Sequence, residues 1–207
     1  MPTIEPVELA TAPEASAKLL KAIEEKVRRP VNMLRMFAHS PAMLDAYVHF
    51  LGALEQCQTS PMLRTLISGT VAQEMGGEYM LSGIFAFGPR EGASPAQIED
   101  SRHARSDDQK TQQVLQFAAK VIQEHGRLPS SEVESLRQAG FSDQEIVEFI
   151  GIIGLNVWRN LVNLIVQTPI DFPPVKLDQT PAAAGNASHG PSLPESCLAS
   201  SYLLSIS

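Results

Sequence analysis

The chain has 207 residues, of which 43% are hydrophobic and 19% charged, a balance typical of a globular protein with one sizeable core. Its formal net charge of -7 argues against nucleic acid or an anionic membrane surface as the main partner, because both require clustered Lys and Arg. Two distant cysteines, Cys57 and Cys197, give neither a disulfide framework nor a metal-ligand spacing.

The first ten residues indicate the compartment. They include Glu5, Glu8 and two prolines and contain no apolar run, so they do not resemble a signal peptide. We therefore expect a reducing, cytoplasmic setting.

Two helices are predicted in the first quarter of the chain. The apolar spacing of Leu20, Ile23 and Val27 predicts a helix from about Pro13 to Arg29. Pro30 ends it. Ser40-Pro41 then opens a second helix, with serine as the N-cap and proline at the first helical position.

Residues 60–84 predict a helix, a two-glycine break and another helix. Ser60-Pro61 repeats the serine-proline start, and Leu63, Leu66 and Val71 follow at helical spacing. Gly76-Gly77 ends the first helix, because glycine adopts positive φ without strain. The backbone N–H groups that open the next helix favour anions and thiolates, so we expect any chemistry at this junction.

Four more helices are predicted downstream. A capping box begins three of them, at Ser94/Gln97, Ser131/Glu134 and Ser142/Glu145. The fourth runs from Lys110 to His125.

The helix from about Asp143 to Val166 is the most apolar stretch. It approaches the roughly 20 residues that a membrane span needs. Glu148, Arg159 and three asparagines are spread through it, and such groups are unfavourable in lipid. We predict a buried central helix whose asparagines bond to neighbouring helices or to a second subunit.

The composition changes at Lys176. From there prolines, glycines and serines dominate without periodicity, which is typical of a disordered tail. The predicted organisation is one helical domain over residues 1–175 and a tail over 176–207.

Several segments resemble one family. Glu78-Tyr79 after a glycine, in its helix-break-helix setting, resembles the core motif of the carboxymuconolactone decarboxylase and alkylhydroperoxidase D superfamily. Further segments resemble its peroxidase-related branch, and these are 32–41, 106–118, 140–148 and 168–173. The resemblance covers about the first 175 residues. It implies an all-α, alkylhydroperoxidase D-like helical bundle that assembles into homo-trimers or hexamers.

The chain departs from this family at its reactive positions. Peroxidase members carry Cys-x-x-Cys where the second helix starts, a His four residues later and a Glu on the preceding helix. The corresponding residues here are Gly77, Met80, Ile84 and Thr65. A thiol peroxidase needs one thiolate to attack the peroxide and a second thiol to resolve the product. The resemblance therefore implies the fold and argues against thiol peroxidase activity.

Three residues at the break are the candidate catalytic groups. A partly buried Glu74 or Glu78 could act as a general base or orient a substrate. Alternatively, Glu78 stabilises the helix dipole and Glu74 is solvated. The Tyr79 hydroxyl could donate to a bound oxyanion, while its ring belongs to the core in either case.

Four further residues are candidate substrate-binding groups. Arg64 could clamp a carboxylate, although a structural ion pair is an alternative. His39 could line a pocket or be a structural, hydrogen-bonded residue. Met80 and Ile84 would form an apolar pocket wall, or simply fill the core. The spacing of His and acidic residues predicts no metal site and no cofactor.

Three functions are compatible with these residues. The first is thiol-free acid-base chemistry, namely decarboxylation, isomerisation or elimination on a small organic acid, lactone or specialised metabolite. The second is a catalytically inactive oligomer that binds a ligand or partner. The third, peroxidase activity through Cys57, lacks a nearby resolving thiol and an activating His.

Overall fold

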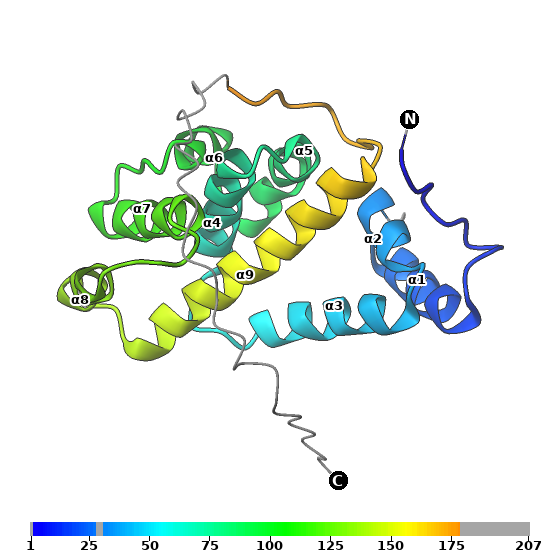
Figure 1. The fold of residues 1–207 in the computed structure, drawn as a ribbon, viewed down its shortest axis with the longest axis horizontal. Helices are drawn as coiled ribbons and strands as arrows, with labels where there is room; N and C mark the ends of the chain where they lie inside the picture. Colours follow the sequence, from blue (N-terminus) through cyan, green and yellow to red (C-terminus); the bar gives the residue numbers. More distant parts are fainter. Residues whose placement is uncertain (1, 28–30, 179–207) are drawn as a thin grey trace, which may run out of the picture.

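The protein, seen here in a computed structural model that describes residues 2–27 and 31–178, is a bundle of α-helices (Figure 1). The helices are α1 (Glu14–Val27), α2 (Asn32–Phe37), α3 (Pro41–Leu54), α4 (Pro61–Glu74), α5 (Glu78–Phe87), α6 (Pro95–Arg102), α7 (Gln109–Gln123), α8 (Ser130–Gln138) and α9 (Asp143–Val166). A short 3₁₀ helix, Gly88–Glu91, follows α5. The described residues contain no strand, which confirms the predicted all-α class.

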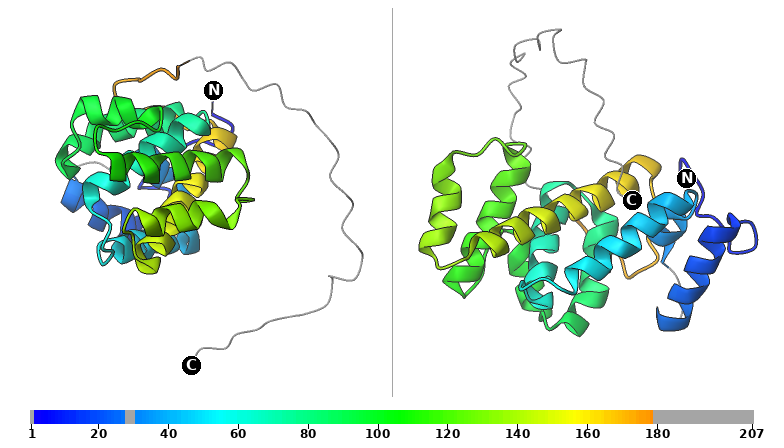
Figure 2. Two further views of the ribbon diagram at one scale, coloured as in Figure 1. Left: turned by 90° about the vertical axis from the view of Figure 1, so that its left-hand side faces the viewer. Right: turned by 90° about the horizontal axis from the view of Figure 1, so that it is seen from below.

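Helix α4 lies at the centre of the bundle and packs against α5, α6, α7 and α9. It carries an unbroken buried run from Leu66 to Ala72. Helix α9 crosses the molecule beside it, with α7 and α8 towards one end and α1 towards the other (Figure 2). The junction between α4 and α5 thus lies at the end of the central helix of the fold.

Most predicted helix starts are confirmed. The Ser40 and Ser60 side chains each accept a hydrogen bond from the N–H group three residues later. Complete capping boxes form at Ser94/Gln97 and Ser142/Glu145. The box predicted at Ser131/Glu134 is wrong: the N-cap of α8 is Pro129, two residues earlier, so Ser131 already lies inside the first turn.

Helix α2 was not expected, because the segment between Pro30 and Pro41 is too short to show periodicity. It buries Met33, Leu34 and Phe37, and this tertiary burial stabilises so short a helix.

The asparagines of α9 were predicted to bond to neighbouring helices or to a second subunit. For their amide nitrogens this prediction was wrong. Each of them donates to a carbonyl one turn earlier on α9 itself: Asn156 to Ile152, Asn160 to Asn156 and Asn163 to Arg159. A buried asparagine in a helix can satisfy its donor locally, without a neighbouring helix.

Helix α9 has the length and apolar composition that a membrane span requires, and it is the one helix of the described residues to meet both criteria. It is also the helix that contacts α2, α4, α5, α7 and α8, as a core helix does. Of the predicted tail, residues 176–178 contact the helices, and residues 179–207 lie outside the described part.

Candidate functional site at the junction of α4 and α5

The junction is a tight turn between two helix ends. Gly76 has φ +72°, the left-handed conformation predicted for a glycine that ends a helix. The Gly77 N–H donates to the Ala72 carbonyl at 2.8 Å, and Gly77 is the N-cap of α5. Because glycine has no side chain, nothing from residue 77 caps the N–H groups of the first turn of α5.

The space beside Gly77 is filled by Asn160 of α9. A Cβ atom placed on Gly77 would lie 1.8 Å from the Asn160 Oδ1 atom. Asn160 is fully buried, and its Oδ1 has no hydrogen-bond partner within the described part of the chain. The amide thus occupies the volume that a side chain at position 77 would need.

Glu74 and Glu78 lie on either side of the turn and have different partners. The Glu74 carboxylate accepts from Gln123 of α7 at 3.0 Å. The Glu78 carboxylate, whose side chain is 38% exposed, pairs with Lys176 at 3.9 Å. Both carboxylates therefore have ordinary surface partners, and the two do not converge on one cavity.

The Tyr79 hydroxyl is already engaged in two hydrogen bonds, one buried and one partly buried. It accepts from the Met33 N–H at 2.9 Å and donates to the Asp171 carboxylate at 2.9 Å. Burial raises the pKa of the phenol well above its usual range, and the Asp171 charge raises it further despite the opposing Met33 bond. Its one proton is therefore committed to Asp171.

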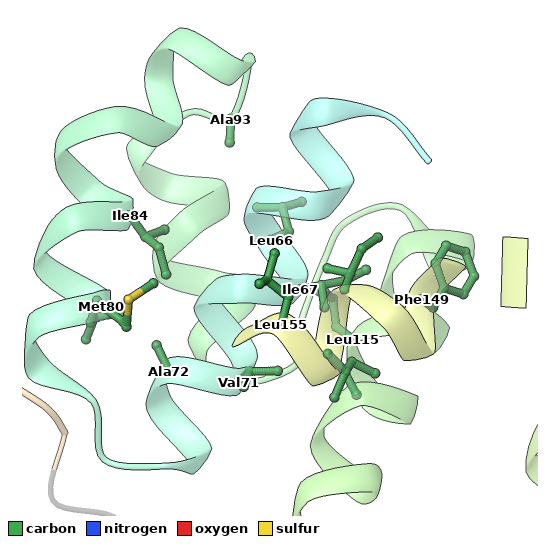
Figure 3. Packing of buried hydrophobic residues seen from close by; sticks show 14 of the residues in the cluster. Leu66, Ile67, Val71, Ala72, Met80, Ile84, Ala93, Leu115, Phe149 and Leu155 are labelled. Carbon is green, nitrogen blue, oxygen red and sulfur yellow. The ribbon is translucent and has the colours of Figure 1, made fainter. Parts of the chain in front are cut away.

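The predicted pocket wall is part of the core. Met80 and Ile84 are both buried and lie among the packed side chains beside Ala72 (Figure 3). Thr65 is half-buried near the far end of α5, where its methyl group lies 2.9 Å from the Cβ position of Gly88. These positions present no thiol, imidazole or carboxylate.

Arg64 and His39 lie away from the junction. Arg64 donates to the carbonyls of Leu54 and Thr59, so it holds the α3–α4 loop. An exposed ring nitrogen of His39 contacts the Glu5 carbonyl at 2.8 Å.

The environment of Cys57 disfavours the thiolate form of its side chain. Partial burial and the nearby Glu148 carboxylate raise the pKa of the thiol, against a lowering effect of Arg64. Its sulfur lies 3.9 Å from the Ala53 carbonyl. Cys197 lies outside the described residues.

One group of side chains has the composition of a metal site. Ligand atoms of Glu99, His103 and Asp178 all lie within 4.8 Å of one another. The Arg102 guanidinium, however, lies 3.0 Å from Glu99 and 3.3 Å from Asp178. It pairs with both carboxylates, so the cluster is an ion-pair network around a buried arginine.

A cavity of about 260 Å³ lies between α4, α6 and the start of α7. Its lining includes Met62, Leu66 and the acidic side chains of Asp100, Asp107 and Asp108. No residue of the 76–84 junction lines it.

Sequence reasoning missed two residues of the junction. Asp171 lies in the segment 168–173, which resembles the family. Nothing in the neighbouring residues indicated that it bonds to Tyr79, 92 positions away. Asn160 was noted as a polar residue of an apolar helix, which was the available signal.

The fold of the chain is found in other proteins of known structure. An uncharacterized peroxidase-related protein from Silicibacter sp. TM1040 superposes with a TM-score of 0.69 and 20% identity, over 84% of this chain and 92% of the other. A peroxidase-related protein from Ralstonia eutropha JMP134, described as an alkylhydroperoxidase AhpD core, superposes with a TM-score of 0.72 and 18% identity. The match covers 82% of this chain and 92% of the other.

The chain has the alkylhydroperoxidase D-like fold. The debrominase Bmp8, solved as a cysteine-to-alanine variant in complex with 2,3,4-tribromopyrrole, shares this fold with a TM-score of 0.69 and 16% identity. The match covers 81% of this chain and 91% of the other. No family model and no curated protein matches the sequence. The neighbours therefore establish the fold and agree with the superfamily resemblance of the sequence.

Proposed function

We propose that this protein is a catalytically inactive, oligomeric member of the alkylhydroperoxidase D-like fold that acts by binding a small-molecule ligand or a partner. One observation carries the proposal: the Asn160 amide fills the volume beside Gly77, where the family resemblance places a reactive thiol. Met80 and Ile84 add no reactive group there, and Tyr79 is held by Asp171.

A second candidate is acid-base chemistry on a small organic acid, lactone or specialised metabolite. Glu78 is the candidate group for it, because this carboxylate lies in the first turn of α5, directly after Gly77. A debrominase with the same fold is a precedent for small-molecule chemistry. Against it, the Lys176 partner of Glu78 is 83% exposed, and the neighbouring Glu74 carboxylate bonds to Gln123 of α7 instead.

The proposed partner is a second copy of the chain, in addition to the small-molecule ligand. The exposed apolar side chains of α9 support self-association, with the trimer or hexamer implied by the resemblance as the proposed assembly. The net charge of -7 disfavours nucleic acid and anionic membranes as partners, and a cytoplasmic setting remains the proposed location.

Peroxide consumption with a dithiol reductant tests the proposal directly. We expect the purified protein to match the no-enzyme blank. Turnover that disappears in Cys57→Ser would instead establish peroxidase activity through that thiol.

Glu78→Gln distinguishes the two leading candidates on a panel of small carboxylic acids and lactones. Turnover by the wild type that falls at least tenfold in Glu78→Gln, but not in the control Glu124→Gln, would overturn the inactive assignment. Ligand binding without turnover, seen as a shift of the unfolding temperature, would support it.

A further inference from the structure

The cavity of about 260 Å³ between α4, α6 and the start of α7, here the α4–α6–α7 cavity, has an apolar floor. Met62 and Leu66 form this floor and lie one turn apart on α4. Leu66 is fully buried and Met62 partly buried. Sites for drug-sized ligands are concave, largely apolar and about 300–1,000 Å³ in volume, so a ligand of this cavity must be smaller.

The rim of the cavity is polar and is ordered by its own hydrogen bonds. Residues 105–108, which link α6 to α7, form one side of it. The Ser106 N–H donates to the Gln112 side chain at 3.3 Å, and the Ser106 hydroxyl accepts from the Asp108 N–H at 3.2 Å. On the other side, the Gln97 side chain is fixed because it completes the capping box of α6. A rim that is already ordered lowers the entropy cost of binding.

Three carboxylates and one guanidinium line the cavity, so its charge is negative. The Asp100 Oδ1 atom lies 3.8 Å from the Arg105 guanidinium. The Asp108 carboxylate accepts from the Thr111 N–H at 2.7 Å. The Asp107 carboxylate has no hydrogen-bond or ion-pair partner in the described part of the chain. This charge distribution attracts a cation and repels a carboxylate or phosphate.

We propose that the α4–α6–α7 cavity binds a small primary amine in its ammonium form, with the apolar body on the floor and the ammonium group at Asp107. An ammonium offers three hydrogen-bond donors, and Asp107 has unused acceptor oxygens. A hard metal ion fits less well, because the floor offers a thioether and an alkyl group instead of oxygen ligands. The inference rests on the proposed ligand-binding role and gives that role a site and a ligand class.

Three ligands of equal chain length test the charge preference, with n-hexylamine as the probe and hexan-1-ol and hexanoate as comparisons. Each is titrated into the isotope-labelled full chain near neutral pH at constant ionic strength, and binding is followed through amide chemical shifts. We expect hexylamine to bind at least tenfold more tightly than hexanoate, with hexanol between them. The shifts should concentrate at residues 62–66 and 105–111. Equal affinities, or shifts confined to other parts of the chain, would overturn the proposal.

A charge variant separates the charge of the cavity from its shape. Asp100→Asn/Asp107→Asn leaves Arg105 with Asp108 as the charged groups of the lining, and both changed side chains reach solvent, so the fold should persist. We expect the preference for hexylamine over hexanoate to fall at least fivefold. The control Asp45→Asn/Glu124→Gln removes the same charge at exposed positions outside the cavity and should keep the preference. An unchanged preference in the cavity variant would contradict the proposal.

Met62→Trp tests the location without changing any charge. The larger side chain occupies the space above Leu66, so the affinity for hexylamine should fall at least fivefold while the helical circular dichroism is kept. Met43→Trp, at an exposed methionine of α3, is the matched control and should bind as the wild type does. Full affinity in Met62→Trp would place the amine elsewhere and overturn the proposal. Failure of these tests removes the amine site alone, because the peroxide assay decides separately whether the protein is inactive.

Discussion

The Tyr79 hydroxyl connects three segments that are distant in the sequence. Its bonds to Met33 and Asp171 connect α5 to the start of α2 and to residues 168–178, the segment that follows α9. Asp171 also accepts from the Asn32 N–H, so one carboxylate and one phenol serve two of the free donors at the start of α2. We interpret Tyr79 as a structural residue for this reason.

Tyr79→Phe should destabilise the protein by about 1–3 kcal/mol, because it leaves the buried Met33 N–H without its acceptor and removes a donor to Asp171. Urea unfolding followed by circular dichroism measures this. The control is Glu124→Gln, an exposed residue at the end of α7, which should leave the midpoint unchanged. A Tyr79→Phe protein as stable as the wild type would remove the structural role.

Much of the junction could be predicted from local residues, and the rest could not. The left-handed Gly76 followed from the chemistry of glycine alone. The contacts of Asn160 with Gly77 and of Asp171 with Tyr79 depend on how α9 and the following residues 168–178 pack against the α4–α5 junction. Such long-range contacts leave no periodic signal in the sequence.

Among the elements, the α3–α4 loop is fastened to α9 by one carboxylate. Glu148 accepts from the N–H groups of Gln58 and Thr59, from the Thr59 hydroxyl and from Gln144. Although partial burial acts to raise the pKa of Glu148, these hydrogen bonds lower it below its ordinary value of 4.5. The folded state therefore binds the proton of Glu148 less tightly than the unfolded chain does.

A pH-dependent effect follows for Glu148→Gln. With a lowered folded pKa, the charged Glu148 stabilises the fold fully above its ordinary pKa, and this contribution is lost as the pH falls through the folded pKa. We expect a loss of about 1–2 kcal/mol near neutral pH, moderated by solvent screening, that shrinks below about pH 4. Urea titrations across this range test it, with the exposed Glu124→Gln as control. A loss independent of pH would contradict the assignment.

Element prediction succeeded where caps and periodicity agreed. Ser60-Pro61 and the Ser142/Glu145 box each determine a helix start by local hydrogen bonds. It failed at α2, which depends on burial of Phe37 against Tyr47 and Trp158. A six-residue helix has too little sequence to carry that information.

At the scale of the whole molecule, α9 has two apolar faces. One packs into the core, and the other is exposed at Val147, Ile150, Leu161, Leu164 and Ile165. With Gly154 and Val157 between them, positions 147, 150, 154, 157, 161 and 164 alternate steps of three and four, the spacing of a helix-pairing seam. Gly154 has open space around its Cβ position, so a second helix can approach closely there.

Charging this seam should dissociate the proposed oligomer without unfolding the subunit. Val147 and Leu161 are 67% and 44% exposed, so Val147→Lys/Leu161→Lys removes little core packing but places two like charges in each copy of the interface. We expect sedimentation velocity to give a trimer or hexamer for the wild type and a monomer for the variant, with unchanged helical circular dichroism. The control Leu9→Lys, an exposed apolar residue away from α9, should keep the wild-type mass. A variant that retains the oligomer would assign assembly to another surface, and a monomeric wild type would leave the exposed face of α9 to a different partner.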